Sequence, residues 1–394
     1  MTELSGNASV AGEGSDFRRA LTSMVAVAAE NAADVDHNSR FPQEAIEAAR
    51  NGSLLGAAVP SEFGGLGLNI AELCHIVEQL GRVCSSTGMV MAMHYIQVLC
   101  LSRHGRSEYL QQVLRRCAKE QLLLASATTE VNIGGDSRSS SCAVRALPEG
   151  QIELKKTCPV ISYGRFADAI LVTARRNEDA VASDQVLVYL PADDYQLNKT
   201  FDWDALGMRG TCSEGFEFAG ITEQAGVLDD LFEKISAETM LPAAHTLWAS
   251  VWYGMAAKAG ENARTVVQRA ARKNPENPPP SALRLAELEV SLQSMAELVR
   301  SAIARYQAGW QSPEVLESLQ FAISMNTLKV ASADLVRKIV GDAMLIVGIA
   351  GFANRSPLSL ARLYRDSIAP SVMVNNDRIY NHTSTLLLVS RGER

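Results

Sequence analysis

The strongest constraint on the fold is a change in hydrophobic periodicity that occurs twice along the chain. Apolar residues recur with helical spacing from about residue 17 to 118, and again from about residue 231 onward. Between these regions, short β-branched runs such as AILVTARR and DQVLVYLPA are separated by Gly, Asp, Asn and Pro. Helices, then strands, then helices predict an α+β protein whose layers are segregated.

Three domains are expected from this order. We place an N-terminal α-helical domain at residues 1–120, a central antiparallel β-barrel or β-sandwich at residues 121–230, and a C-terminal helical domain at residues 231–394. Within the last region, two long amphipathic segments are separated by NPENPPP, because consecutive prolines cannot continue a helix. A third long helical segment follows.

Charge and composition narrow the classes of function. The net charge of −7 and the pI of about 5.5 give no electrostatic footprint for nucleic acid, so no such partner is expected. No apolar run approaches the ~20 residues that span a bilayer, and the start of the sequence lacks the parts of a secretory signal. The seven cysteines form no CxxC pair and the six histidines show no metal-ligand spacing. We therefore expect reduced thiols, no metal, no membrane attachment and a cytoplasmic location.

Five segments carry a resemblance to a known family. They are AAVPSEFGGLGL (57–68), TTEVNIGGD (128–136), ISYGRFAD (161–168), DALGMRGTCSEGFEF (204–218) and ARLYRDS (361–367). In this order they resemble the P-x-E-x-GG-x-G, T-E-P-x-x-G-S-D, W-I-(S/T)-N, L-G-M-R and R-L-Y-R-D motifs of the acyl-CoA dehydrogenase family. The resemblance covers nearly the whole chain and implies that residues 231–394 form a four-helix bundle.

The resemblance also implies FAD as the cofactor. Thr128 and Thr129 fall where the family contacts the flavin ring, and Ser162 falls where a second hydroxyl approaches flavin N5. Gly134 and Gly135 fall in a turn whose backbone N–H groups can hold a pyrophosphate. Without the common register, ordinary strand and turn chemistry would explain Thr129 and Ser162.

Several residues depart from the family pattern. Gly135 replaces a serine, and Val160 replaces the tryptophan that covers the flavin. RKNPENPPPSAL lacks the arginine and phenylalanine that reach the cofactor of the neighbouring subunit, and MLIVGIAGF lacks a glutamine. Altered FAD binding, or loss of the cofactor, therefore stays open.

The usual catalytic base is missing from the C-terminal region. Dehydrogenation of an acyl thioester needs a carboxylate opposite the flavin to remove the α-proton. The family's glutamate falls at Val374 or Asn375, and neither side chain accepts a proton usefully at neutral pH. Isovaleryl-CoA dehydrogenase and its relatives carry the base at the start of the first bundle helix, where AETMLPAAH places Glu238. The competing explanation is a helix-start charge behind an N-cap at Ser236.

Three further residues are expected on the substrate side by resemblance. They are His94, in the apolar segment MVMAMHYIQV, and Asn375 and Asn376 near the C-terminus. A lone histidine among apolar residues is more often a hydrogen-bonded core residue than a catalyst.

Three functions remain open. The leading one is FAD-dependent α,β-dehydrogenation of an acyl thioester of CoA or a carrier protein, with an electron-transfer partner. The second is a flavin monooxygenase or oxidase on the same fold, in which oxygen accepts the electrons and no carboxylate base is required. The third is a flavin-free binding scaffold. The resemblance also implies a homodimer or homotetramer.

Overall fold

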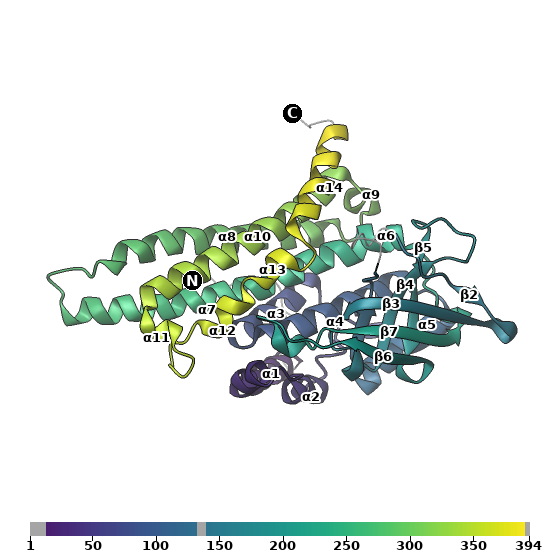
Figure 1. Cartoon of the computed structure of the whole chain (residues 1–394), viewed down its shortest axis with the longest axis horizontal. Helices are drawn as coiled ribbons and strands as arrows, with labels where there is room; N and C mark the ends of the chain where they lie inside the picture. Colours follow the sequence, from purple (N-terminus) through teal and green to yellow (C-terminus); the bar gives the residue numbers. More distant parts are fainter. Residues whose placement is uncertain (1–12, 132–138, 391–394) are drawn as a thin grey trace.

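A computed structural model describes residues 13–131 and 139–390, which fold into an N-terminal helical layer, two sheets and a C-terminal bundle (Figure 1). The helices of the first layer are α1 (Glu13–His37), α2 (Gln43–Asn51), α3 (Ile70–Val83), α4 (Ser85–His104) and α5 (Glu108–Glu120). α3 begins with a capping box at Asn69. The Asn69 side chain accepts from backbone N–H groups of α3, and the Glu72 carboxylate accepts from the backbone N–H of Asn69.

The central strands form two separate sheets rather than a closed barrel in the part of the chain that is described. The strands are β1 (Leu124–Ala127), β2 (Arg145–Ala146), β3 (Gln151–Ile161), β4 (Ala169–Arg175), β5 (Gln185–Pro191), β6 (Tyr195–Phe201) and β7 (Glu214–Glu223). One sheet has the order β1-β4-β5 and the other β2-β3-β7-β6. The predicted sandwich is thus confirmed.

The prediction that all strand pairs are antiparallel was wrong for one pair. β1 lies parallel to β4, with Leu124 opposite Ala169. Between these two strands the chain crosses to the other sheet and returns, and such a crossover lets two strands run in the same direction. Periodicity alone does not reveal this, because it reports which face of a strand is buried and not which neighbour the strand pairs with.

The C-terminal layer is dominated by three long helices. Its elements are α6 (Phe232–Ile235), a π-helical turn (Ser236–Met240), α7 (Leu241–Lys273), α8 (Ser281–Gly309), α9 (Pro313–Leu316), α10 (Leu319–Val347), α11 (Ile349–Phe352), α12 (Ala361–Asp366), α13 (Ala369–Val372) and α14 (Asn376–Val389). α7, α8 and α10 pack along one another, and α12, α13 and α14 each contact α10. α14 projects away from the bundle (Figure 1).

Two glycines bring the first layer and the bundle into close contact. A Cβ atom on Gly81 of α3 would lie 2.3 Å from the carbonyl oxygen of Val251 in α7. A Cβ atom on Gly254 of α7 would lie 2.2 Å from the carbonyl oxygen of Glu78 in α3. Any larger residue at either position would force the two backbones apart, so this pair sets the spacing between the domains.

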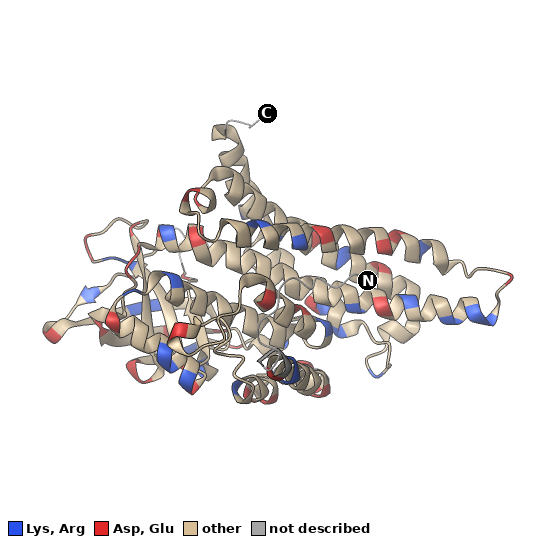
Figure 2. Ribbon diagram, turned by 180° about the vertical axis from the view of Figure 1, so that it is seen from behind, with Lys and Arg blue, Asp and Glu red and all other residues tan. Residues whose placement is uncertain are grey.

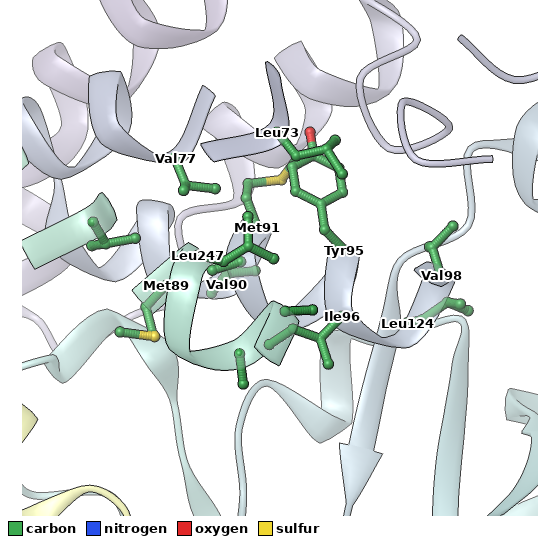
Figure 3. Packing of buried hydrophobic residues seen from close by; sticks show 14 of the residues in the cluster. Leu73, Val77, Met89, Val90, Met91, Tyr95, Ile96, Val98, Leu124 and Leu247 are labelled. Atoms are coloured by element: carbon green, nitrogen blue, oxygen red, sulfur yellow. The ribbon is translucent and has the colours of Figure 1, made fainter. Parts of the chain in front are cut away.

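The hydrophobic core is shared by all three layers. α4 is buried on nearly every side, which explains why its sequence is apolar all round rather than on one stripe. Figure 3 shows side chains of α3, α4, β1 and α7 packed together, among them Val77, Tyr95, Leu124 and Leu247. The site residues described below are therefore held by one continuous core.

Over residues 13–131 and 139–390, the helices are all too short or too polar to traverse a lipid bilayer. Within the same residues, His, Cys, Asp and Glu side chains do not gather into any group that could hold a metal ion. The seven cysteines are buried free thiols. Lys and Arg are interspersed with Asp and Glu over the layers (Figure 2).

Candidate flavin and substrate site

The two hydroxyls expected at the flavin ring lie on adjoining segments. Thr128 and Thr129 follow directly after β1 and are half-buried. The Oγ1 atom of Thr129 donates to the carbonyl oxygen of Val160 at 2.6 Å, near the end of β3. Ser162 follows two residues later, so tertiary folding brings together two positions that are 33 residues apart in the sequence.

Ser162 is the first member of a chain of hydroxyls that the sequence did not identify. Its Oγ lies 2.8 Å from Oγ of Ser213, which lies 2.7 Å from Oγ1 of Thr211. Thr211 donates its hydrogen to the carbonyl oxygen of Met208 at 2.9 Å. Each hydroxyl has one hydrogen, so Ser213 donates to Thr211 and Ser162 donates to Ser213. The oxygen of Ser162 then remains as an acceptor.

The sequence did contain a signal for these three hydrogen-bonded hydroxyls. Thr211 and Ser213 belong to LGMRGTCSEG, one of the segments that carry the family resemblance. Both side chains are buried, and a buried hydroxyl needs a hydrogen-bond partner. Gly134 and Gly135, expected on the phosphate side, lie outside the described residues.

Glu238 lies in the π-helical turn in front of α7 and is 2% exposed. The competing explanation, a helix start behind an N-cap at Ser236, does not hold, because Ser236 has helical backbone angles within a continuous run from α6 to α7. The hydroxyl of Tyr306 lies 3.3 Å and 3.4 Å from the carbonyl oxygens of Glu238 and Thr239. The π-turn thus has a side-chain donor for carbonyl groups that a regular helix would bond internally.

The carboxylate of Glu238 is engaged by an arginine of the N-terminal layer. Its Oε2 atom lies 2.8 Å from Nη2 and 3.0 Å from Nε of Arg103, at the end of α4. Oε1 accepts no hydrogen bond from any described residue and lies 3.8 Å from Nζ of Lys234. The guanidinium of Arg103 also covers the ring of Trp310, 4.8 Å from its centroid. The two contacts from Arg103 thus orient the carboxylate toward the end of α4.

A second set of hydrogen bonds, centred on His104, stabilises the π-helical turn at Ser236–Met240. His104 contacts Asp230 through Nδ1 and Thr239 through Nε2, each at 2.8 Å. Burial lowers the pKa of His104, although Asp230 opposes this shift. In the neutral ring Nδ1 donates to the carboxylate and Nε2 accepts from the Thr239 hydroxyl. Arg106 holds the pKa of Asp230 well below its usual range.

His94, expected on the substrate side, is completely buried in the core. Its Nε2 lies 2.8 Å from the carbonyl oxygen of Leu55, and its Nδ1 accepts from the backbone N–H of Leu124 at 3.0 Å. Burial lowers the pKa of His94 to about 4, so the ring is neutral near pH 7. Nδ1 thus connects the first layer to β1, whereas Nε2 makes a hydrogen bond within the first layer.

Asn375 and Asn376 have different surroundings. Asn375 is exposed, and its side chain caps α14 by accepting from the N–H of Asp377. Asn376 is buried and accepts from Nζ of Lys329 at 2.7 Å. The same ammonium donates to the carbonyl oxygens of Pro370 and Val374, at 2.9 Å and 2.6 Å. Lys329 therefore anchors the segment on which the family places its usual base.

Two family models match the chain. The acyl-CoA dehydrogenase N-terminal domain matches residues 13–121, and the acyl-CoA dehydrogenase C-terminal domain matches residues 236–373. Together the two segments cover more than half of the chain. The chain belongs to the acyl-CoA dehydrogenase family.

Two relatives of this family member that align over most of the chain share about a quarter of its residues. It is 23% identical over 367 residues to the probable acyl-CoA dehydrogenase fadE25 of Mycobacterium leprae, covering 89% of this chain and 88% of the relative. It is 24% identical over 352 residues to the amino sugar nitrososynthase DnmZ of Streptomyces peucetius, covering 86% and 84%. The FMN-bound structure of TdsC from Paenibacillus superimposes with a TM-score of 0.82 at 20% identity, covering 95% and 98%.

The residues of this acyl-CoA dehydrogenase family member fit a flavin. The family uses FAD, and similar solved structures contain FMN. The half-buried Thr129 and Ser162 offer hydroxyl oxygens as acceptors, together with backbone groups, at the ends of β1 and β3, where a polar ring edge can meet them. Thr129 and Ser162 would hold the ring, and the bound flavin would supply two-electron redox chemistry.

Proposed function

We propose that this chain is a flavin-dependent monooxygenase or oxidase, in which molecular oxygen accepts the electrons of the reduced cofactor. One observation carries the proposal: the carboxylate of Glu238 is held by Arg103 at 2.8 Å. A base of the dehydrogenase type must reach the α-carbon of a substrate, whereas two contacts from Arg103 direct this carboxylate toward the end of α4. Oxygen-dependent chemistry requires no such base.

The electron balance of this reaction differs from that of a dehydrogenase. In a monooxygenation, two electrons of the reduced cofactor and two protons convert one O₂ into an oxygen atom on the substrate and one water. An external hydride donor would supply the two electrons for each turnover. The monooxygenase TdsC and the nitrososynthase DnmZ, similar in fold and in sequence respectively, support this reading through their names.

Dehydrogenation of an acyl thioester is the second candidate, with CoA or a carrier protein as the thiol and an electron-transfer partner. Two observations favour it. Oε1 of Glu238 accepts no hydrogen bond from the described residues, so one carboxylate oxygen is available to a substrate. Several full-length relatives, including fadE25, carry the name acyl-CoA dehydrogenase. In this reaction Glu238 would take the α-proton, and a bound flavin would supply the hydride-accepting chemistry.

Anaerobic flavin reduction separates the two candidates. Protein loaded with FAD, and in parallel with FMN, is mixed without oxygen with a panel of acyl-CoA esters while absorbance near 450 nm is followed. The proposal predicts no bleaching by any ester. It also predicts that the chemically reduced holoprotein is reoxidised by oxygen at least as fast as free reduced flavin.

Two variants give this experiment a matched control. Glu238→Gln removes the carboxylate of the buried turn, and Glu233→Gln removes an exposed carboxylate of the adjacent α6. Bleaching by an acyl-CoA ester that survives in Glu233→Gln and is lost in Glu238→Gln would overturn the proposal and establish the dehydrogenase. The loss expected for removal of a general base is about 10² to 10⁴ in rate.

A further inference from the structure

Lys156 occupies an unusual position for a charged side chain. It lies on the inward face of β3, between Leu154 and Cys158, and its side chain is 0% exposed. An ammonium group in such a place is costly unless its three hydrogens and its charge are all compensated. The partners of Lys156 therefore show what the side chain holds together.

The three hydrogens of Lys156 bridge the two sheets. Nζ donates to the carbonyl oxygen and to Oγ1 of Thr173 in β4, each at 2.8 Å. It also donates to the carbonyl oxygen of Ala127 at 3.1 Å. Ala127 is the last residue of β1 and immediately precedes Thr128. The residue immediately before Thr128 and Thr129 is thus hydrogen-bonded to the ammonium of Lys156.

Glu130, which immediately follows Thr129, balances the charge of Lys156. Oε2 of Glu130 lies 3.8 Å from Nζ, and the Glu130 side chain is almost completely buried. This carboxylate also accepts from Oγ of Ser140 at 2.8 Å and from the backbone N–H groups of Ser141 and Cys142, each at 3.0 Å. Burial raises the pKa of Glu130, but these bonds and Lys156 outweigh it, so the pKa lies below its usual value.

We propose that Lys156 is a positioning residue for the flavin, because with Glu130 it fixes both flanks of Thr128–Thr129. Ala127 is hydrogen-bonded to the ammonium, Glu130 pairs with it, and Thr129 is bonded to Val160 on the same strand. The two threonines are therefore held to β3 at three neighbouring points. The inference rests on the flavin-binding part of the proposed function and not on the fate of the electrons.

The alternative is a structural link between the sheets with no bearing on the cofactor. Well-packed apolar residues usually join two sheets as firmly as a buried ion pair does. A structural link predicts lower thermal stability and unchanged flavin affinity in the folded protein. A positioning residue predicts weaker flavin binding under conditions in which the variant is fully folded. The two readings therefore differ in a binding constant.

The test compares Lys156→Met with Lys155→Met. Lys155 is the preceding residue of the same strand, its side chain is 69% exposed, and it pairs with Glu153 at 3.0 Å. The dissociation constants of FAD and FMN are measured by fluorescence quenching at 10 °C, with folding checked by circular dichroism. We expect Lys156→Met to raise the flavin Kd by about tenfold or more and Lys155→Met to leave it unchanged.

A milder variant covers the case in which Lys156→Met does not fold. Thr173→Val keeps the shape of the side chain and removes one acceptor of the ammonium, and we expect it to raise the Kd by about threefold. A flavin Kd equal to wild type in folded Lys156→Met, or in Thr173→Val where the first variant is unfolded, overturns the inference and leaves the proposed function intact. A wild-type protein that binds no flavin overturns both.

Discussion

Arg103 and Glu238 form an ion pair between the N-terminal layer and the bundle, with Nη2 of the arginine 2.8 Å from Oε2 of the glutamate. The two residues are 135 positions apart in the sequence. The pair is almost completely buried on the glutamate side, so it joins two domains at the turn that the family resemblance identifies as a catalytic position.

The first prediction concerns the energy of this pair. Arg103→Met should lower the free energy of unfolding by about 3–5 kcal/mol, because it leaves a buried carboxylate without its partner. Adding Glu238→Gln should restore much of this loss, since the double variant buries no unpaired charge. Urea denaturation of wild type, the two single variants and the double variant measures the coupling free energy between the two side chains. Purely additive losses would show that the two side chains do not stabilise each other.

The second prediction concerns acid stability. The pKa of His94 is about 4 in the folded protein against 6.5 for the free side chain. Between these values the unfolded chain binds a proton that the folded chain does not, so stability falls as pH decreases from 6.5 to 4. The loss for one such histidine is up to about 3 kcal/mol.

His94→Gln should lessen this dependence, because glutamine does not titrate and carries both an acceptor and a donor, while the buried His245 keeps its own contribution. Thermal melts at several pH values between 4 and 7 test the prediction. His37→Gln, at the exposed end of α1, serves as the control and should leave the dependence unchanged. An equal acid loss in His94→Gln and in wild type would contradict the assignment.

The third prediction separates the two asparagines. Asn375→Ala removes the cap of α14 and should cost about 1 kcal/mol. Asn376→Ala removes an acceptor of the buried Lys329 ammonium. It should lower the free energy of unfolding by about 1–3 kcal/mol, which is more than the loss expected for Asn375→Ala. Chemical denaturation of both variants gives the order. A greater loss in Asn375→Ala would show that Lys329 does not depend on Asn376.

The fourth prediction concerns assembly. Leu345, Ile349 and Phe352 are 66%, 81% and 70% exposed within eight residues at the end of α10 and in α11. Large apolar side chains gathered on a surface often mark an interface, so we expect a homodimer or homotetramer that uses this face. Sedimentation velocity at micromolar concentration should show an oligomer for wild type and dissociation for Ile349→Asp. Val181→Asp, another exposed apolar position, should remain oligomeric.

Part of the site was predictable from the sequence because it consists of local motifs. The segments around Thr129 and Ser162 were identified by resemblance, and the structure brings them together through the bond from Thr129 to Val160. Ser213 lay within a recognised segment, yet its hydrogen bond to Ser162 depends on the pairing of β3 with β7, which a linear pattern does not specify. The contacts of Lys156 with Thr173, Ala127 and Glu130 were not predictable for the same reason.

The sequence by itself determined the order of helices and strands, the family and the absence of a carboxylate at Val374 and Asn375. These features follow from periodicity and local residue identity, which do not depend on distant parts of the chain. Only the tertiary structure decided that β1 runs parallel to β4, that His94 is a core residue, and that Glu238 pairs with Arg103. Each of these depends on which groups become neighbours when the core closes, because burial requires polar groups to find hydrogen-bond partners inside the protein.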